Sequence, residues 1–122
     1  MLKLAAFVVI EISPGMFAAT TRPTDRGEQG KIGLPGGKVD PGETSVQTAI
    51  REAFEEGWDI SGIESTPFHT EMVDGFEIFW YRAKSAQQLT FYKEMHRIQP
   101  IIATFDQLVN SGYGNDNAMK AF

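Results

Sequence analysis

Glu52, Glu55 and Glu56 are three carboxylates that follow one another at intervals of one, three and four positions in a stretch that favours a helix. A helix brings side chains three and four positions apart within roughly 5–6 Å of each other. Carboxylates at such short distances raise each other's pKa unless a cation lies between them. Hard divalent cations such as Mg²⁺ prefer oxygen ligands of this kind. The spacing therefore fits a metal site, although an isolated motif of this type is more often a solvated acidic face.

The residues that precede the glutamates make the pattern more specific. Residues 36–56 read GGKVDPGETSVQTAIREAFEE, in which Gly37, Glu43 and Arg51 stand at fixed distances before the glutamates. So many fixed positions are a stronger signal than a lone glycine motif. The run resembles the Nudix box, the signature of hydrolases that cleave a nucleoside diphosphate linked to another moiety. The lead-in GLPGGK at residues 33–38 is similar to the family as well.

The chain departs from the family pattern directly after the paired glutamates. The family usually continues with any residue, a glycine and an aliphatic residue, whereas this chain has Gly57, Trp58 and Asp59. A glycine just past a helix end commonly adopts the left-handed conformation that caps the last turn. We therefore expect the helix to end early and Ile60 to take over the apolar contact, without a change at the carboxylates.

The resemblance implies that water attacks a phosphorus of a diphosphate bridge. Metal ions neutralise the polyphosphate, and a metal-bound water loses its proton more readily. The implied ligands are Glu52, Glu55 and Glu56, with the carbonyl of Gly37 as an additional oxygen. Glu52 and Glu56 lie one helical turn apart and should chelate best, and Glu55 is a candidate for activating water in addition to binding metal. Mg²⁺ is the expected ion, and Mn²⁺ accepts the same ligands.

Charged residues around the glutamates suggest supporting roles. A guanidinium can hold a carboxylate in two-point contact, so we expect Arg51 and Glu43 to pair and to orient the ligands. The alternative is a surface ion pair that contributes little. Lys38 is a candidate for phosphate binding or a solvated loop lysine. Arg22 and Lys31 flank a polar loop and are further phosphate candidates, although a solvated role is commoner for such residues.

A carboxylate or histidine from a loop before the last strand often assists catalysis in the family. Glu94 is the candidate for an auxiliary metal ligand, whereas His96 fits an ordinary surface histidine and His69 has no assigned role. The sequence does not identify the general base.

Length and motif position resemble the small MutT-like branch, which handles nucleoside triphosphates, including oxidised ones. In that branch an asparagine near the last helix reads the base, and asparagine carries both a donor and an acceptor. Asn115 and Asn117 lie in that region, although asparagine also favours helix caps. The proline that marks ADP-ribose enzymes and the tyrosine that marks dinucleoside polyphosphate enzymes are both missing near positions 74–77. (Deoxy)nucleoside triphosphates therefore remain the leading substrates.

Strands and helices alternate along the chain in a way that can position these residues. Apolar runs predict strands near 3–12, 16–21, 32–34, 67–72, 76–83 and 101–104. Helices are predicted at about 44–56, with a capping box of Thr44 and Gln47, at 105–109 and at 115–122. The order suggests a mixed sheet between helices in one domain over residues 1–122. The resemblance implies the same α/β fold, a Nudix-type α/β/α sandwich.

Composition narrows the possible partners. The 122 residues include no cysteine, which rules out a thiolate metal site and fits a cytoplasmic protein. The net charge of −5 and the lack of a basic stripe argue against duplex nucleic acid and favour a small-molecule nucleotide. The apolar start is too short to span a membrane. We expect a monomer or homodimer. The alternatives are hydrolysis of a nucleotide sugar, ADP-ribose or an RNA 5′ end, and a non-catalytic nucleotide-binding module, which the intact glutamates disfavour.

Overall fold

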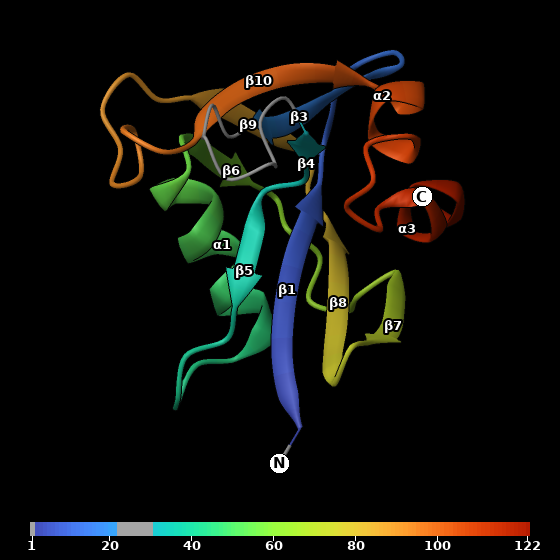
Figure 1. Cartoon of the computed structure of the whole chain (residues 1–122). Helices are drawn as coiled ribbons and strands as arrows, with labels where there is room; N and C mark the ends of the chain where they lie inside the picture. The colour runs from blue at the N-terminus through green and yellow to red at the C-terminus, as the bar shows by residue number, and fades with distance from the viewer. Residues whose placement is uncertain (1, 22–30) are drawn as a thin grey trace.

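The computed structural model describes residues 2–21 and 31–122, and within them the chain forms ten strands and three helices (Figure 1). The strands are β1 (Lys3–Val9), β2 (Glu11–Ser13), β3 (Met16–Thr21), β4 (Ile32–Gly33), β5 (Gly36–Lys38), β6 (Trp58–Ser61), β7 (His69–Val73), β8 (Phe76–Arg82), β9 (Ser85–Gln88) and β10 (Gln99–Thr104). The helices are α1 (Ser45–Glu55), α2 (Phe105–Val109) and α3 (Asp116–Ala121).

The central sheet has the strand order β5-β1-β8-β7. Strand β1 pairs antiparallel with β5 and parallel with β8, and β7 pairs antiparallel with β8. The sheet is therefore mixed, as the sequence predicts. A strand that is paired on both edges and covered on both faces must be apolar throughout, which explains the continuous apolar run of β1.

Two smaller sheets complete the structure. Strands β10, β3 and β2 form one of them, with β4 paired to β3, and β6 pairs antiparallel with β9. The prediction missed β6 and β9. It placed no strand between the first helix and residue 67, and it left residues 84–99 unassigned.

The central sheet separates two hydrophobic cores, with α1 on one side and α2 and α3 on the other (Figure 1). Side chains alternate along β1, so that Ala6 and Val8 face α1 and Val9 faces α3. The same alternation on β8 sends Tyr81 to the α1 side and Trp80 to the α3 side. This arrangement confirms the predicted α/β/α sandwich.

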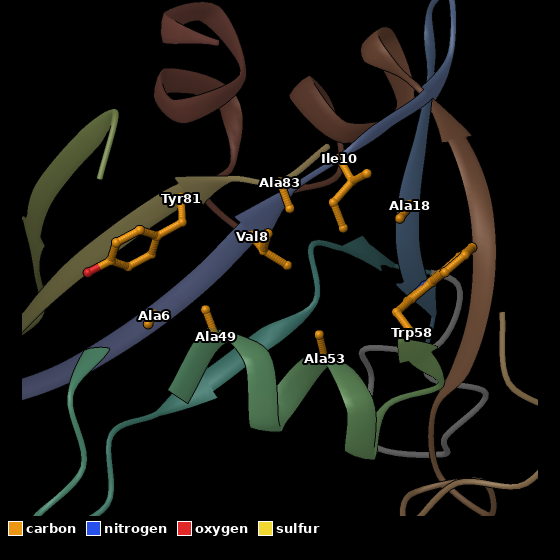
Figure 2. Packing of buried hydrophobic residues seen from close by; sticks show 9 residues of the cluster. All are labelled: Ala6, Val8, Ile10, Ala18, Ala49, Ala53, Trp58, Tyr81 and Ala83. Carbon is orange, nitrogen blue, oxygen red and sulfur yellow. The ribbon is translucent and has the colours of Figure 1, made fainter. Parts of the chain in front are cut away.

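Helix α1 begins with the predicted capping box, in which the side chain of Thr44 accepts from the backbone N–H of Gln47. Ala49 and Ala53 are fully buried and point toward β1 (Figure 2). Ile50 and Phe54, which fall at helical spacing beside these alanines, are 42% and 51% exposed. Small alanines let α1 lie close to the sheet, and the buried stripe is narrower than the apolar pattern suggests.

The end of α1 agrees with the expectation for the early glycine. Gly57 has a φ of 105°, and the helix ends at Glu55. Trp58, however, takes the buried position together with the partly buried Ile60. The indole Nε1 of Trp58 donates to the carbonyl of Ala19 at 2.8 Å, so that this buried polar atom is satisfied.

Among the described residues, no helix combines the length and apolar character needed to cross a membrane.

Candidate functional site

Arg51 joins the loop before α1 to the helix. Its Nε donates to Oε2 of Glu43 at 2.7 Å and its Nη2 donates to Oε1 at 2.9 Å, a two-point contact between guanidinium and carboxylate. The hydrogen bond from Arg51 is the largest cause that lowers the pKa of Glu43 to about 2, and the same contact raises the pKa of Arg51. Arg51 Nη2 also donates to the carbonyl of Lys38 at 3.3 Å. The structure therefore contains the pair expected from the sequence.

The same guanidinium holds three further carboxylates. Its Nη1 lies 3.0 Å from Oε2 of Glu52 and 3.4 Å from Oε2 of Glu55, and its Nη2 lies 3.3 Å from Oδ2 of Asp40. Sequence reasoning missed Asp40, which lies on the loop beside the glycine turn. The result is a cluster of acids organised around one cation, in which Glu52 and Glu55 converge on a single nitrogen.

Glu52 lies directly against the backbone of Gly37. A Cβ at Gly37 would lie 2.6 Å from the carboxyl carbon of Glu52, so a larger residue would displace the carboxylate. Burial is the largest influence on the pKa of Glu52 and raises it, although the hydrogen bond from Arg51 acts in the opposite direction. Glycine at position 37 thus lets the backbone lie against the carboxylate of Glu52. The two expected metal ligands, the carbonyl of Gly37 and the carboxylate of Glu52, need this proximity.

Glu56 is the most buried of the three helix glutamates, with 5% of its surface exposed. Its Oε1 accepts a hydrogen bond from the backbone N–H of Gly36 at 3.0 Å. Gly36 has a φ of 156°, and a Cβ there would lie 2.3 Å from the carbonyl oxygen of Ala6. The glycine turn therefore packs against β1 and presents its N–H to Glu56.

Glu56 also lines a cavity of about 230 Å³ between β1, β8 and the segment before α3. Its polar lining includes Thr20, Lys31 and Asn115. The apolar and backbone lining consists of Phe7, Gly33, Leu34, Gly36, Val73, Ile78, Trp80, Ile98, Tyr113 and Gly114. The rings of Phe7 and Trp80 are stacked, with centroids 6.0 Å apart. One wall of the cavity is thus aromatic, and another carries a carboxylate of the glutamate motif.

The donor set has the chemistry of a site for a hard divalent cation, because it consists of carboxylates and a glycine carbonyl. Within the described part of the chain, no three acidic or histidine side chains are already gathered around one point where an ion would bind. Glu52 and Glu55 turn toward Arg51, and Glu56 turns toward Gly36. The oxygen atoms of these three glutamates and of Gly37 are the type of ligand that a divalent cation prefers. To bind one, the glutamate side chains must leave their present contacts with Arg51 and Gly36.

The structure distinguishes between the two predicted asparagines. Asn115 is buried and lines the cavity, and its Nδ2 donates to Oγ of Ser111 at 3.2 Å. It stands at the N-cap position of α3 but makes no capping hydrogen bond with its side chain. Asn117 is exposed in the first turn of α3 and does not line the cavity.

The remaining predicted residues lie apart from the acid cluster or at its margin. The ammonium group of Lys38 lies 5.8 Å from the ring centroid of Phe76. Glu94 pairs with Arg97 at 3.0 Å, while its backbone N–H donates to the carbonyl of Glu55 at 2.8 Å and so fixes its loop beside α1. Arg22, a predicted substrate contact, lies outside the described residues.

Tyr113 is a cavity residue that sequence reasoning missed. The ammonium group of Lys31 lies 5.4 Å from its ring centroid, and a Cβ at Gly33 would lie 3.3 Å from the same ring. An available signal was the run Gly112-Tyr113-Gly114, in which two glycines flank an aromatic residue just before the last helix. Both glycines have positive φ, 82° and 74°, and this turn directs the tyrosine inward.

The fold and the acid cluster define a Nudix domain, and comparison with known proteins agrees. The model of the NUDIX domain family matches residues 1–107, so the chain belongs to this family. That finding confirms the resemblance read from the glutamate motif.

One curated protein is similar to part of the sequence, and two solved structures are similar in fold. Nudix hydrolase 3 of Caenorhabditis elegans is 55% identical over 31 residues, which are 25% of this chain and 13% of that protein's length. A solved structure from a study of MutT from Aliivibrio salmonicida and Vibrio cholerae is 22% identical to this chain. Its TM-score is 0.74, over 97% of this chain and 94% of the other. A MutT NUDIX hydrolase of Burkholderia pseudomallei is 21% identical with a TM-score of 0.73, over 96% and 94%. The two structural likenesses confirm the fold.

Proposed function

We propose that this protein is a Nudix hydrolase that converts a (deoxy)nucleoside triphosphate to a monophosphate and pyrophosphate by attack of water at phosphorus. The observation that carries the proposal is the cavity that Glu56 of the Nudix box shares with Asn115 and the stacked rings of Phe7 and Trp80. A nucleotide offers a flat base for the aromatic wall and a phosphate chain that a divalent cation would join to the carboxylate end. Both ends of such a substrate therefore find matching chemistry.

Glu52, Glu55, Glu56 and the carbonyl of Gly37 would hold Mg²⁺, or Mn²⁺ in its place. The ion would neutralise the polyphosphate and make a water easier to deprotonate. Arg51 and Glu43 orient this set, because one guanidinium joins the loop carboxylate to two of the helix glutamates. Glu94 is a candidate auxiliary ligand on the adjacent loop, and Lys38 and Arg22 are candidate phosphate contacts.

Asn115 is the candidate for reading the base. Its buried amide uses one N–H toward Ser111, and the amide also has a second N–H and an oxygen. Asn117 is the weaker candidate, since its side chain is exposed. A nucleotide sugar or ADP-ribose would use the same carboxylates with another leaving group. The net charge of −5 disfavours an RNA 5′ end, and a purely nucleotide-binding module would have no need of the intact glutamates. We also propose a cytoplasmic monomer or homodimer.

The proposal is tested by release of pyrophosphate and phosphate from a substrate panel with Mg²⁺ or Mn²⁺, and then with chelator. The panel contains common and 8-oxidised (deoxy)nucleoside triphosphates, ADP-ribose, a dinucleoside polyphosphate and nucleotide sugars. We expect metal-dependent release of pyrophosphate from a triphosphate. Hydrolysis of a diphosphate-linked compound in place of a triphosphate would change the assigned substrate class. If no compound of the panel is hydrolysed, the result would favour a nucleotide-binding module.

Glu56→Gln tests the site itself. Loss of this carboxylate should lower kcat by about a hundredfold or more while the far-UV circular dichroism spectrum stays unchanged. Glu64→Gln is the matched control, because Glu64 is an exposed glutamate outside the acid cluster and the cavity. Activity that survives in Glu56→Gln at the level of the control would contradict the assigned site.

A further inference from the structure

Arg82, the last residue of β8, holds the end of α3 by two kinds of contact. Its guanidinium carbon lies 4.6 Å from the ring centroid of Phe68 and 4.5 Å from that of Phe122. Its Nη1 donates to the carbonyl of Phe122 at 3.2 Å, and its Nη2 donates to that of Ala121 at 3.4 Å. Arginine near a helix C-terminus satisfies carbonyls that have no partner within the helix. Both of these hydrogen bonds go to the end of α3, so the helix end is the main polar contact of Arg82 among the described residues.

Phe122 extends this contact into the core. Its ring meets those of Phe17 and Phe68 edge to face, each at a centroid distance of 5.6 Å. Phe17 belongs to β3 and is 3% exposed, so the end of α3 is fixed to both the central sheet and a smaller sheet. We call Arg82, Phe68 and Phe122 the helix clamp.

The other end of α3 forms part of the cavity wall. The N–H of Met119 donates to the carbonyl of Asn115 at 2.9 Å, which connects Asn115 to the first turn of the helix. Ala118 and Met119 are buried in the core on the α3 side. A helix of six residues is too short to be stable by itself, so its position depends on such tertiary contacts. A displacement at its C-terminus is therefore carried to Asn115.

We propose that Arg82 is a positioning residue, which through the helix clamp sets where α3 holds Asn115 against the nucleotide. The inference rests on the proposed function for its effect on catalysis. Arg82 does not line the cavity, so it acts on substrate affinity through α3. Its ring contacts and hydrogen bonds lie at the C-terminal end of α3 and involve none of the motif glutamates, which should keep their positions.

Arg82→Met tests the proposal, because methionine keeps the apolar stem but removes the charge and the donors. We expect KM for the preferred triphosphate to rise about three- to tenfold and kcat to stay within about twofold of wild type. Arg82→Lys should recover part of the lost affinity, since an ammonium retains the contact with the rings. Lys120→Met is the matched control, because it removes an exposed cation from the same helix without touching the clamp.

A second readout does not require turnover. In nucleotide-free protein, the side-chain amide signals of Asn115 and the exchange rate of the Met119 N–H should change in Arg82→Met and stay unchanged in Lys120→Met. If Arg82→Met does not fold, Phe122→Leu applies the same test, because it removes one ring of the clamp and keeps an apolar side chain. Unchanged Asn115 signals would overturn the proposal whatever the activity. Changed signals in a protein that hydrolyses nothing would support the clamp and count against the proposed function alone.

Discussion

At the scale of single residues, the site depends on one cation that serves several acids. Arg51 contacts Glu43 with two hydrogen bonds and reaches Glu52 and Glu55 from the same guanidinium. A lysine could not replace it, because a point charge lacks the planar set of donors that binds two carboxylates in fixed directions. The pairing was predictable from the spacing of Glu43 and Arg51. The part played by Asp40 was not, because the loop had to fold before its carboxylate met Arg51.

Glu43 gives a prediction about pH. Its pKa falls from the ordinary value of 4.5 to about 2 in the folded protein, so the unfolded state binds more protons between these values. The stabilising effect of Glu43 is complete above pH 4.5 and is lost as the pH falls toward 2. At pH 7 we expect Glu43→Gln to lower the free energy of unfolding by about 1 kcal/mol, a modest value because solvent reaches the pair.

Urea denaturation of wild type and Glu43→Gln across this pH range measures the difference. The gap between the two proteins should be largest at neutral pH and shrink in acid. A gap that stays constant with pH would show that the variant loses packing and not the charge-assisted hydrogen bonds.

At the scale of elements, local signals were reliable where a few adjacent residues decide the structure. Thr44 and Gln47 form the predicted capping box. Asp74 and Gly75, a pair of residues common in hairpin turns, form the turn between β7 and β8 with φ values of 50° and 83°. Strands β6 and β9 were missed because they are short and partly polar, and each is a strand because the other lies beside it. Sequence reasoning likewise named both Asn115 and Asn117, because the cavity that Asn115 lines and Asn117 does not is built from distant strands.

The junction between α1 and β10 gives a prediction at this scale. A Cβ at Gly57 would lie 2.7 Å from Cγ of Pro100, and Gly57 has a positive φ of 105°. Gly57→Ala should therefore lower the free energy of unfolding by about 2 kcal/mol or more. Gly15→Ala is the control, because Gly15 also has a positive φ, 75°, but open space around its Cβ.

Thermal or urea denaturation of the two alanine variants separates strain in the backbone from collision with Pro100. If both variants lose the same stability, the close approach of the helix end to β10 contributes nothing, and the glycine is needed for its φ alone.

At the scale of the whole molecule, two cores share one sheet. Strands β1 and β8 contribute alternate side chains to each core, so neither face can lose its packing without exposing the strands of the other. The chain places one tryptophan in each core, Trp58 on the α1 side and Trp80 on the α3 side. We therefore predict that residues 1–122 unfold as a single cooperative domain.

Trp58→Phe and Trp80→Phe each leave one fluorescent tryptophan as a reporter of one core. In each variant the midpoint of the fluorescence change in urea should coincide with the midpoint from far-UV circular dichroism. Comparing the two signals within each variant allows for any stability that the substitution removes. An earlier midpoint for Trp80 alone would mean that the face with α3 and the cavity opens separately, and the helix clamp would then act on a locally unfolding unit and not on a rigid wall.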